Sequence, residues 1–425
     1  MKKILKDDRG SISTVVLVTV LFFVTVLSTG YMIAATLRQG QLKSELVAKE
    51  TYEKPLNNLE ELADEIKGTL QSTAETTPYL PDDSFKKVPG TDLSKGLVIE
   101  DKYENQYVWV EVPKSLYNNT NYNSNNAKKP SSSTDYANIE YCLQQYTATY
   151  RNGTDYSDTY AADTDNVGWF ADAKAYNNLK NSMLKSVYEN GGFYVGRYEA
   201  GIGTNRTSEG PTNSDGKYTI EGMPVPVSKA DAYPYTYVTR TQAQNLASKV
   251  NAGTKTSSLM FGVQWDLVLA FMSKDTAKIT STDVLTKDST TIGNYLNSTF
   301  DLNRGKYAQY INAENTWNNF DSALGSIVVS NETTGKMKKT EQSSYKNGIL
   351  LTTGGTEQSK VMNIYDIAGN VFEWTLEKTS FPPIHPCVHR GGYCDLTGSS
   401  DPVAYRDNGS SDESDSGTGF RVSLF

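Results

Sequence analysis

The stretch "DIAGNVFE", residues 366–373, combines groups that could hold a metal ion. Asp366 and Glu373 offer carboxylates, and the backbone carbonyls of Gly369 and Val371 lie between them in the chain. Hard cations such as calcium prefer such an all-oxygen set of ligands. The pattern predicts a calcium site with a structural role. The alternative is a turn in which Glu373 caps a backbone group or forms a salt bridge.

Cysteine and histidine are scarce, which limits the chemistry that the chain can perform. Its 2 histidines are His385 and His389, so most zinc sites and most histidine-based catalytic triads are excluded. Its 3 cysteines are Cys142, Cys387 and Cys394. Cys387 and Cys394 are close enough in sequence to close a small disulfide loop in an oxidising compartment, and free buried thiols are the alternative.

The overall composition favours recognition of a ligand by polar surface groups. The chain has 425 residues, a formal net charge of -8 and 28 tyrosines. The negative charge disfavours a nucleic-acid partner. Tyrosine contributes a large contact area with few torsions to freeze, which suits a binding surface.

The N-terminus predicts a membrane anchor. Residues 1–10 form a charged, basic leader, and residues 11–36 contain no charged side chain, which is long enough for one helix to cross a bilayer. The helix is expected to run from 11 to 54, with an amphipathic helix and a linker at 55–98. The basic leader favours a single-pass protein in the cell membrane with its C-terminal domain outside.

This layout resembles a type IV prepilin or pseudopilin. The resemblance implies cleavage after Gly10 and possible contacts with pilus subunits. The fifth residue after that point is Val15, where the family usually has glutamate, which makes a minor subunit or a plain membrane anchor the expectation.

A large mixed domain is expected at 99–425, because short aromatic and β-branched runs alternate there with polar loops. Residues 193–198 and the terminal "FRVSLF" are typical of strands. Thr239 or Thr241 is expected to cap a helix ending near 250, and a second helix is expected at 263–272. The Asn-, Ser- and Tyr-rich residues 117–165 are expected to be a surface insertion.

Several residues near these segments have predicted structural roles. Trp265, Trp374 and Phe420 are expected in the core. Arg421 is expected to pair with a buried acid or carbonyl, because its neighbours are apolar. Gly391 and Gly392 allow the backbone to pass close to other groups.

Three of these segments, in this order, resemble the formylglycine-generating enzyme or sulfatase-modifying-factor family. They are "GNVFEW" at 369–374, "RGG" at 390–392 and "GFRV" at 419–422. The resemblance covers residues 106–425 and implies an α+β domain with a variant C-type lectin fold and long loops. Members of the family bind calcium at the stretch that matches 366–373.

The enzymatic activity of that family is not expected here. It depends on two cysteines shortly after RGG that bind one copper ion, and soft thiolates suit Cu(I). Only Cys394 follows RGG in this chain, whereas Cys387 precedes it. The domain is therefore predicted to be a binding module without catalysis, and a modified oxidoreductase is the alternative.

Residues 393–416, between RGG and GFRV, are rich in Asp and Ser, include Tyr393 and Tyr405, and contain no Lys, Gln, Met or Trp. Only Glu413 cannot be reached from an asparagine codon by changing its adenines. This resembles the variable proteins of diversity-generating retroelements, which mutate adenines in a repeat that encodes a ligand-binding face. A solvated acidic loop is the alternative. The candidate ligand-binding residues are Tyr393, Asp395, Ser400, Asp401, Tyr405, Asp407, Asn408, Asp412, Ser414 and Asp415.

The sequence thus predicts a surface-displayed receptor or adhesin that binds an external protein or glycan through 393–416. We expect this segment to be a loop whose interior takes no part in the core. A minor pilin whose domain merely caps a filament is a further alternative.

Overall fold

The computed structural model describes residues 70–151, 156–160, 170–309, 316–319, 327–329, 332–334, 337–338, 348–380 and 384–425. All of these residues belong to one compact unit of the chain. The predicted leader at 1–10, the helix at 11–54 and most of the amphipathic helix that follows lie outside the described residues. Among the residues that are described, no helix has the length and apolarity needed to cross a membrane.

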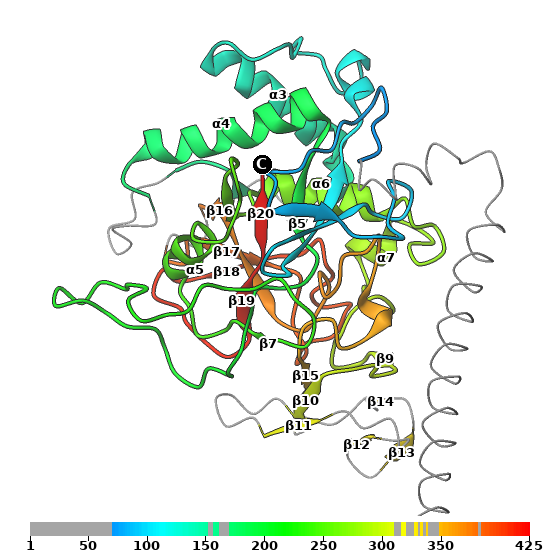
Figure 1. Ribbon diagram of the computed structural model, residues 1–425, viewed down its shortest axis with the longest axis vertical. Coiled ribbons are helices and arrows are strands. Elements are labelled where there is room, and N and C mark those ends of the chain that lie inside the picture. The colour runs from blue at the N-terminus through cyan, green and yellow to red at the C-terminus, as the bar shows by residue number, and fades with distance from the viewer. Residues whose placement is uncertain are drawn as a thin grey trace, which may run out of the picture. The chain divides into compact units, whose positions relative to one another are not determined.

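The domain combines helices with mostly antiparallel strands, which confirms the α+β class. Its six-stranded sheet has the order β1-β2-β3-β5-β20-β8, and all neighbours in it are antiparallel. The predicted C-terminal strand, β20, lies between β5 and β8 at the centre of the molecule (Figure 1). The strands of this sheet are β1 (Phe85–Lys87), β2 (Val98–Asp101), β3 (Gln106–Glu111), β5 (Gly192–Gly196), β8 (Ser257–Leu259) and β20 (Val422–Leu424).

The segment before residue 99 is part of this sheet, so the prediction of a linker there is wrong from β1 onwards. β1 pairs with β2, and Phe85 and Leu97 are buried in the main core. Apolar residues are widely spaced in this segment, so the sequence has no hydrophobic pattern that predicts a strand. β1 is buried because it pairs with β2.

A second sheet carries the three C-terminal motifs and has the order β18-β17-β16-β19, with β4 also paired to β16. β16 and β19 run parallel, whereas its other pairs are antiparallel. This sheet links GNVFEW, RGG and GFRV in space. Its strands are β4 (Tyr156–Ser157), β16 (Phe372–Thr379), β17 (Cys387–Arg390), β18 (Arg406–Gly409) and β19 (Thr418–Phe420).

Both predicted helices are present. Thr239 caps α5 (Arg240–Ala247) through a capping box with Gln242, which satisfies two backbone N–H groups at the helix start. α6 (Gly262–Met272) is buried on all sides. Asp158 accepts hydrogen bonds from the first two backbone N–H groups of α6, at 2.7 and 2.9 Å.

The region 117–165, expected to be a surface insertion, contains α3 (Ser133–Tyr146) and packs on the core. Ile139 and Leu143 of this helix are fully buried, and Ser132 caps its N-terminus. α3 lies against α4 (Ala173–Asn190), as Figure 1 shows. The expectation failed because the helix has few apolar residues, and these lie one turn apart among polar side chains.

The remaining elements are short and joined by long loops. Most of them lie between residues 200 and 360. The helical elements are η2 (Lys114–Asn118), η3 (Ala148–Tyr150), α7 (Asp283–Thr286) and η4 (Glu357–Ser359). The strands are β6 (Gly201–Ile202), β7 (Tyr233–Pro234), β9 (Thr299–Phe300), β10 (Lys306–Gln309), β11 (Trp317–Asn319), β12 (Ile327–Val329), β13 (Glu332–Thr334), β14 (Met337–Lys338) and β15 (Ile349–Leu351).

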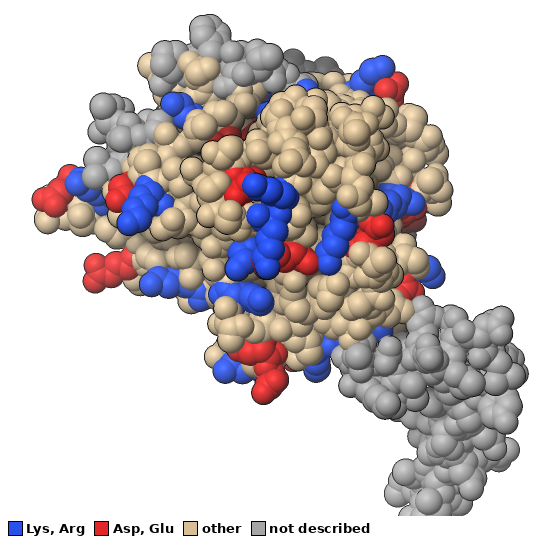
Figure 2. Space-filling model, turned by 90° about the horizontal axis from the view of Figure 1, so that it is seen from above, with Lys and Arg blue, Asp and Glu red and all other residues tan. Residues whose placement is uncertain are grey.

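The surface carries interspersed charges of both signs. On the face shown in Figure 2, Lys and Arg lie close to Asp and Glu, and most of the visible surface belongs to uncharged residues. Uncharged residues therefore provide most of the area visible on this face.

Candidate functional site

The RGG motif brings the chain from the second sheet into residues 393–416. Gly391 and Gly392 both have positive φ angles, 95° and 72°. A Cβ atom on Gly392 would lie 2.6 Å from the carbonyl oxygen of Asp401 and 2.7 Å from the ring of Tyr295. Only glycine permits this close approach, and the predicted role of the two glycines is confirmed.

The middle of segment 393–416 is buried, so the expectation that it takes no part in the core is wrong. Val403 and Ala404 are at most 1% exposed. The indole N–H of Trp265 donates to the carbonyl oxygen of Val403 at 3.0 Å. Strand β18 follows and pairs with β17. The segment is thus attached to the core at its centre as well as at its two ends.

A buried ionic network anchors β18. Arg406 donates to Glu377 at 2.7 Å and to Asp266 at 2.7 and 2.9 Å. Arg390 contacts the same two carboxylates at 3.0 Å each. All four side chains are at most 4% exposed. Two guanidinium groups therefore balance two carboxylates, which offsets the cost of removing these charges from water.

The pKa values in this network follow from burial and from the two arginines. Burial alone would raise the pKa of Glu377, but Arg406 and Arg390 lower it to about 2. For Asp266, burial raises the pKa and the same arginines oppose the rise. Because each carboxylate contacts two guanidinium groups at 2.7–3.0 Å, we treat both as ionised at neutral pH.

The ten predicted ligand-binding residues differ in exposure. Ser400, Asp412 and Asp415 are exposed, whereas Asp401 is only 7% exposed. The six half-buried residues are Tyr393, Asp395, Tyr405, Asp407, Asn408 and Ser414. The hydroxyl oxygen of Ser414 is buried. The other exposed and half-buried members leave side-chain atoms accessible to a ligand, and Asp401 contributes mainly to the packing of the segment.

Several of these residues also stabilise local turns. Asp395 accepts a hydrogen bond from the backbone N–H of Gly348 at 2.5 Å, and Asp415 accepts one from Gly417 at 2.8 Å. Asp412 accepts one from the hydroxyl of Ser410 at 2.6 Å. The carboxylates are held in defined positions, which lowers the entropic cost of using them to bind a ligand.

An aromatic cluster that the sequence analysis did not identify lies beside the segment. The ring of Phe372 lies 4.2 Å from that of His389 and 5.1 Å from that of Tyr393. His389 also meets Trp374 at 5.1 Å, and its Nε2 lies 3.6 Å from Glu413. His389 is opposite Asp407 in the sheet register, so both side chains point to the same face. The sequence of β17, "CVHR", has no alternation that could have indicated this placement.

The predicted calcium ligands already have partners within the protein. Asp366 accepts hydrogen bonds from the backbone N–H of Gly354 at 2.5 Å and from the hydroxyl of Ser359 at 2.6 Å. Glu373 binds Arg421 with both oxygens, at 2.6–3.0 Å. The predicted pairing of Arg421 with a buried acid is confirmed, and the geometry of Glu373 matches the salt-bridge alternative.

The backbone between these two carboxylates forms a tight, buried turn. Gly369 has a φ of 72°, and its N–H donates to the carbonyl oxygen of Gly391 at 2.8 Å. Val371 is 1% exposed, and its backbone nitrogen lies 3.4 Å from a carboxylate oxygen of Glu199. Glu199 is buried beside Asp366 and Glu373, and burial and these two carboxylates raise its pKa. Within the described residues, no group of three or more His, Cys, Asp or Glu side chains is arranged to hold a metal ion. In this geometry a calcium ion would have to compete with Arg421, and calcium binding stays a prediction.

All three cysteines are buried, and none of them forms a disulfide with another. Cys387 belongs to the main core, whereas Cys394 packs with Leu350 and Val371 in a separate cluster. The structure thus has the free-thiol alternative in place of the Cys387–Cys394 disulfide.

Comparisons with known proteins place this chain in no established family. No protein-family model matches it, and no curated protein matches its sequence.

Proposed function

We propose that this protein is a surface-displayed receptor or adhesin in which residues 393–416, carried on a variant C-type lectin fold, bind an external protein or glycan. The observation that carries the proposal is the mixed character of this segment. Arg406 and Val403 attach it to the core, while Ser400, Asp412 and Asp415 reach solvent. A rigid backbone that presents exchangeable polar side chains is what an adaptable binding surface requires.

The chemistry of the segment indicates how such a ligand would be held. Its acidic side chains accept hydrogen bonds, and Tyr393 and Tyr405 add contact area. Burial raises the pKa of both tyrosines, and neighbouring aspartates raise it further, so both hydroxyls stay protonated and can donate at neutral pH. The charge of Arg406 is neutralised in the interior, which leaves the segment negative. A ligand with basic or hydrogen-bond-donating groups fits this surface.

The resemblance to retroelement variable proteins adds a genetic proposal. If 393–416 is diversified, substitutions should concentrate at the exposed and half-buried positions. Arg406, Val403 and Ala404 should stay constant in functional copies, because each is at most 4% exposed and contacts the core.

The test is to sequence the encoding locus and its sibling copies. We expect a near-identical second copy of the DNA for residues 390–425 beside a reverse transcriptase gene, with mismatches confined to template adenines. Substitutions spread evenly over the domain, with no second copy, would contradict the diversified-receptor proposal.

Display at the cell membrane, with or without pilus subunits, is the proposed context for this domain. A pull-down with the full chain tests it against the alternatives. Recovery of an external protein or glycan that is lost when Ser400, Asp412 and Asp415 are all replaced by alanine supports the receptor. Recovery of pilus components alone favours a minor pilin, and stoichiometric Cu(I) binding by the reduced chain favours an oxidoreductase.

A further inference from the structure

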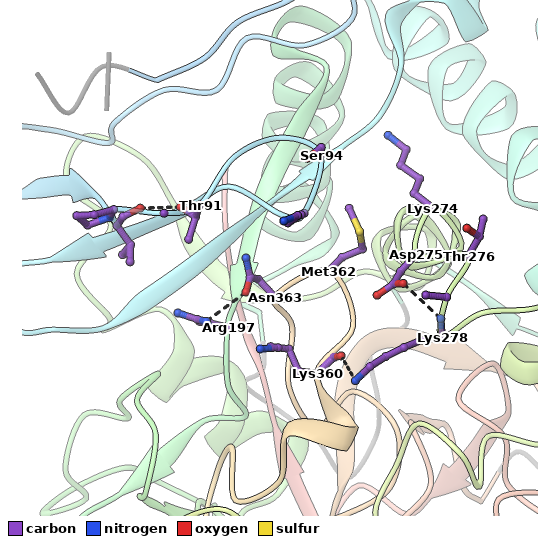
Figure 3. A pocket seen from close by; sticks show the side chains of 15 residues that line it. Thr91, Ser94, Arg197, Lys274, Asp275, Thr276, Lys278, Lys360, Met362 and Asn363 are labelled. Atoms are coloured by element: carbon purple, nitrogen blue, oxygen red, sulfur yellow. Dashed lines mark hydrogen bonds between the residues drawn. The ribbon is translucent and has the colours of Figure 1, made fainter. Parts of the chain in front are cut away.

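A second candidate site lies away from residues 393–416, in a cavity of about 630 Å³. Its walls come from three parts of the chain: the loop between β1 and β2, the turn after α6, and residues 360–363 (Figure 3). Arg197, which follows β5, closes one side. The volume lies within the range of about 300–1,000 Å³ that is usual for small-ligand sites.

The cavity is lined by an excess of positive charge. Its basic residues are Lys95, Arg197, Lys274, Lys278 and Lys360, and its only acidic residue is Asp275. Two of the lysines have carboxylate partners just outside the lining. Lys274 binds Glu111 at 2.9 Å, and Lys360 binds Glu357.

The other three basic residues form no salt bridge within the described part of the chain. Arg197 donates to the side-chain oxygens of Gln106 at 2.8 Å and Asn363 at 3.2 Å, which are neutral, and its Nε is buried without a partner. Lys278 donates to three backbone carbonyls at 2.7–3.0 Å. Burial lowers the pKa of Lys278, Asp275 and Glu357 oppose this shift, and the ammonium of Lys360 adds to it. Lys278 and Lys360 are like charges at one wall of the cavity, which favours a bound anion there.

The wall at Met362 and Asn363 is a strained turn. Both residues have positive φ angles, 48° and 63°, and the flanking residues Val361 and Ile364 bond to each other through their backbones. A residue with a side chain, such as Met362, is disfavoured in this conformation. Asn363 is held from two sides, by Arg197 and by the carbonyl oxygen of Gly96 at 2.8 Å. The turn thus keeps Met362 at the cavity beside the cations (Figure 3).

We propose that this cavity binds a small organic anion, with its carboxylate, sulfate or phosphate group facing Lys95, Arg197 and Lys360 and its carbon body against Met362. The ammonium and guanidinium groups supply charge-assisted hydrogen bonds to the oxyanion. Val88, Pro89 and Ala277 add apolar surface to the lining, which suits an organic body better than a bare ion. The site shares no residue with 393–416 and does not depend on the function proposed above.

The test is calorimetric titration of the full chain with glucose 6-phosphate, glucuronate and glucose. We expect both charged sugars to bind more tightly than glucose and to weaken as salt is added. The charged sugar that binds more tightly identifies the preferred oxyanion. The site variant is Lys95→Gln with Lys360→Gln, and the control is Lys174→Gln with Lys249→Gln, which removes the same charge from exposed positions elsewhere.

The site variant should weaken binding of the charged sugars by about tenfold or more, because each lost charge-assisted hydrogen bond carries an effect of that order. The control should bind as the parent does, and both variants should unfold at the parent's temperature. Equal binding of glucose and the charged sugars, equal weakening in both variants, or no binding of either charged sugar would overturn the proposal.

Discussion

Replacement of Arg406 by alanine tests whether segment 393–416 is anchored through the buried ionic network. The change removes the guanidinium that lies 2.7 Å from both Glu377 and Asp266. Arg390 remains at 3.0 Å from each carboxylate and Arg151 lies 3.9 Å from Asp266, so the two buried carboxylates keep only one close guanidinium. Breaking a buried ion pair in this way costs about 3–5 kcal/mol. We expect a loss of that size in the free energy of unfolding at neutral pH.

The pH dependence gives a second, independent readout. The pKa of Glu377 is about 2 in the folded protein and 4.5 ordinarily. Because the folded pKa is the lower one, this stabilisation is complete above pH 4.5 and is lost as the pH falls towards 2. The difference corresponds to about 3 kcal/mol. Without Arg406 the pKa of Glu377 rises, so the variant should lose less stability over this acid range than the parent does.

The assay is urea unfolding of the full chain, followed by tryptophan fluorescence, across a series of pH values. Arg151→Ala serves as the matched control, because this arginine also faces Asp266 but at 3.9 Å and with 24% of its side chain exposed. It should cost less than about 1 kcal/mol. Equal, small losses for Arg406→Ala and Arg151→Ala, with parallel pH profiles, would refute the reasoning that the network anchors the segment.

Three further changes test other parts of the molecule. Gly392→Ala should lower the free energy of unfolding by at least about 1–2 kcal/mol, because the residue has a φ of 72° and its new Cβ would lie 2.6 Å from a backbone oxygen. Gly203→Ala, where a Cβ meets nothing within 4 Å, is the control in the same unfolding experiment. Ser400→Ala and Asp412→Asn should alter ligand capture while changing stability by less than about 0.5 kcal/mol, and a large fall in thermal midpoint would show that these residues support the fold instead. If 366–373 binds calcium, added calcium should raise the thermal midpoint and Asp366→Ala should abolish that response, whereas identical midpoints in calcium and in a chelator would argue for the salt bridge alone.

Several features could be predicted from the sequence because their causes are local. A threonine followed three residues later by glutamine, as in Thr239 and Gln242, can form a capping box at the start of a helix. Adjacent glycines permit the positive φ angles found at Gly391 and Gly392. Arg421 lies between apolar neighbours, which predicts a buried acid or carbonyl as its partner. The sequence could not identify that partner as Glu373, because the contact depends on how the strands pair.

The tertiary structure alone decided which side chains of 393–416 reach solvent. The composition of the segment predicted a free polar loop. Arg406 is nevertheless buried, because it pairs with Asp266 and Glu377, which are distant from it in the sequence. Contacts between separate segments also bury β1 and bring His389 against Phe372. They place lysines from three segments around one cavity. A sequence determines turns, caps and strand alternation through neighbouring residues. Exposure and charge balance depend on contacts between distant residues, which exist only once the chain has folded.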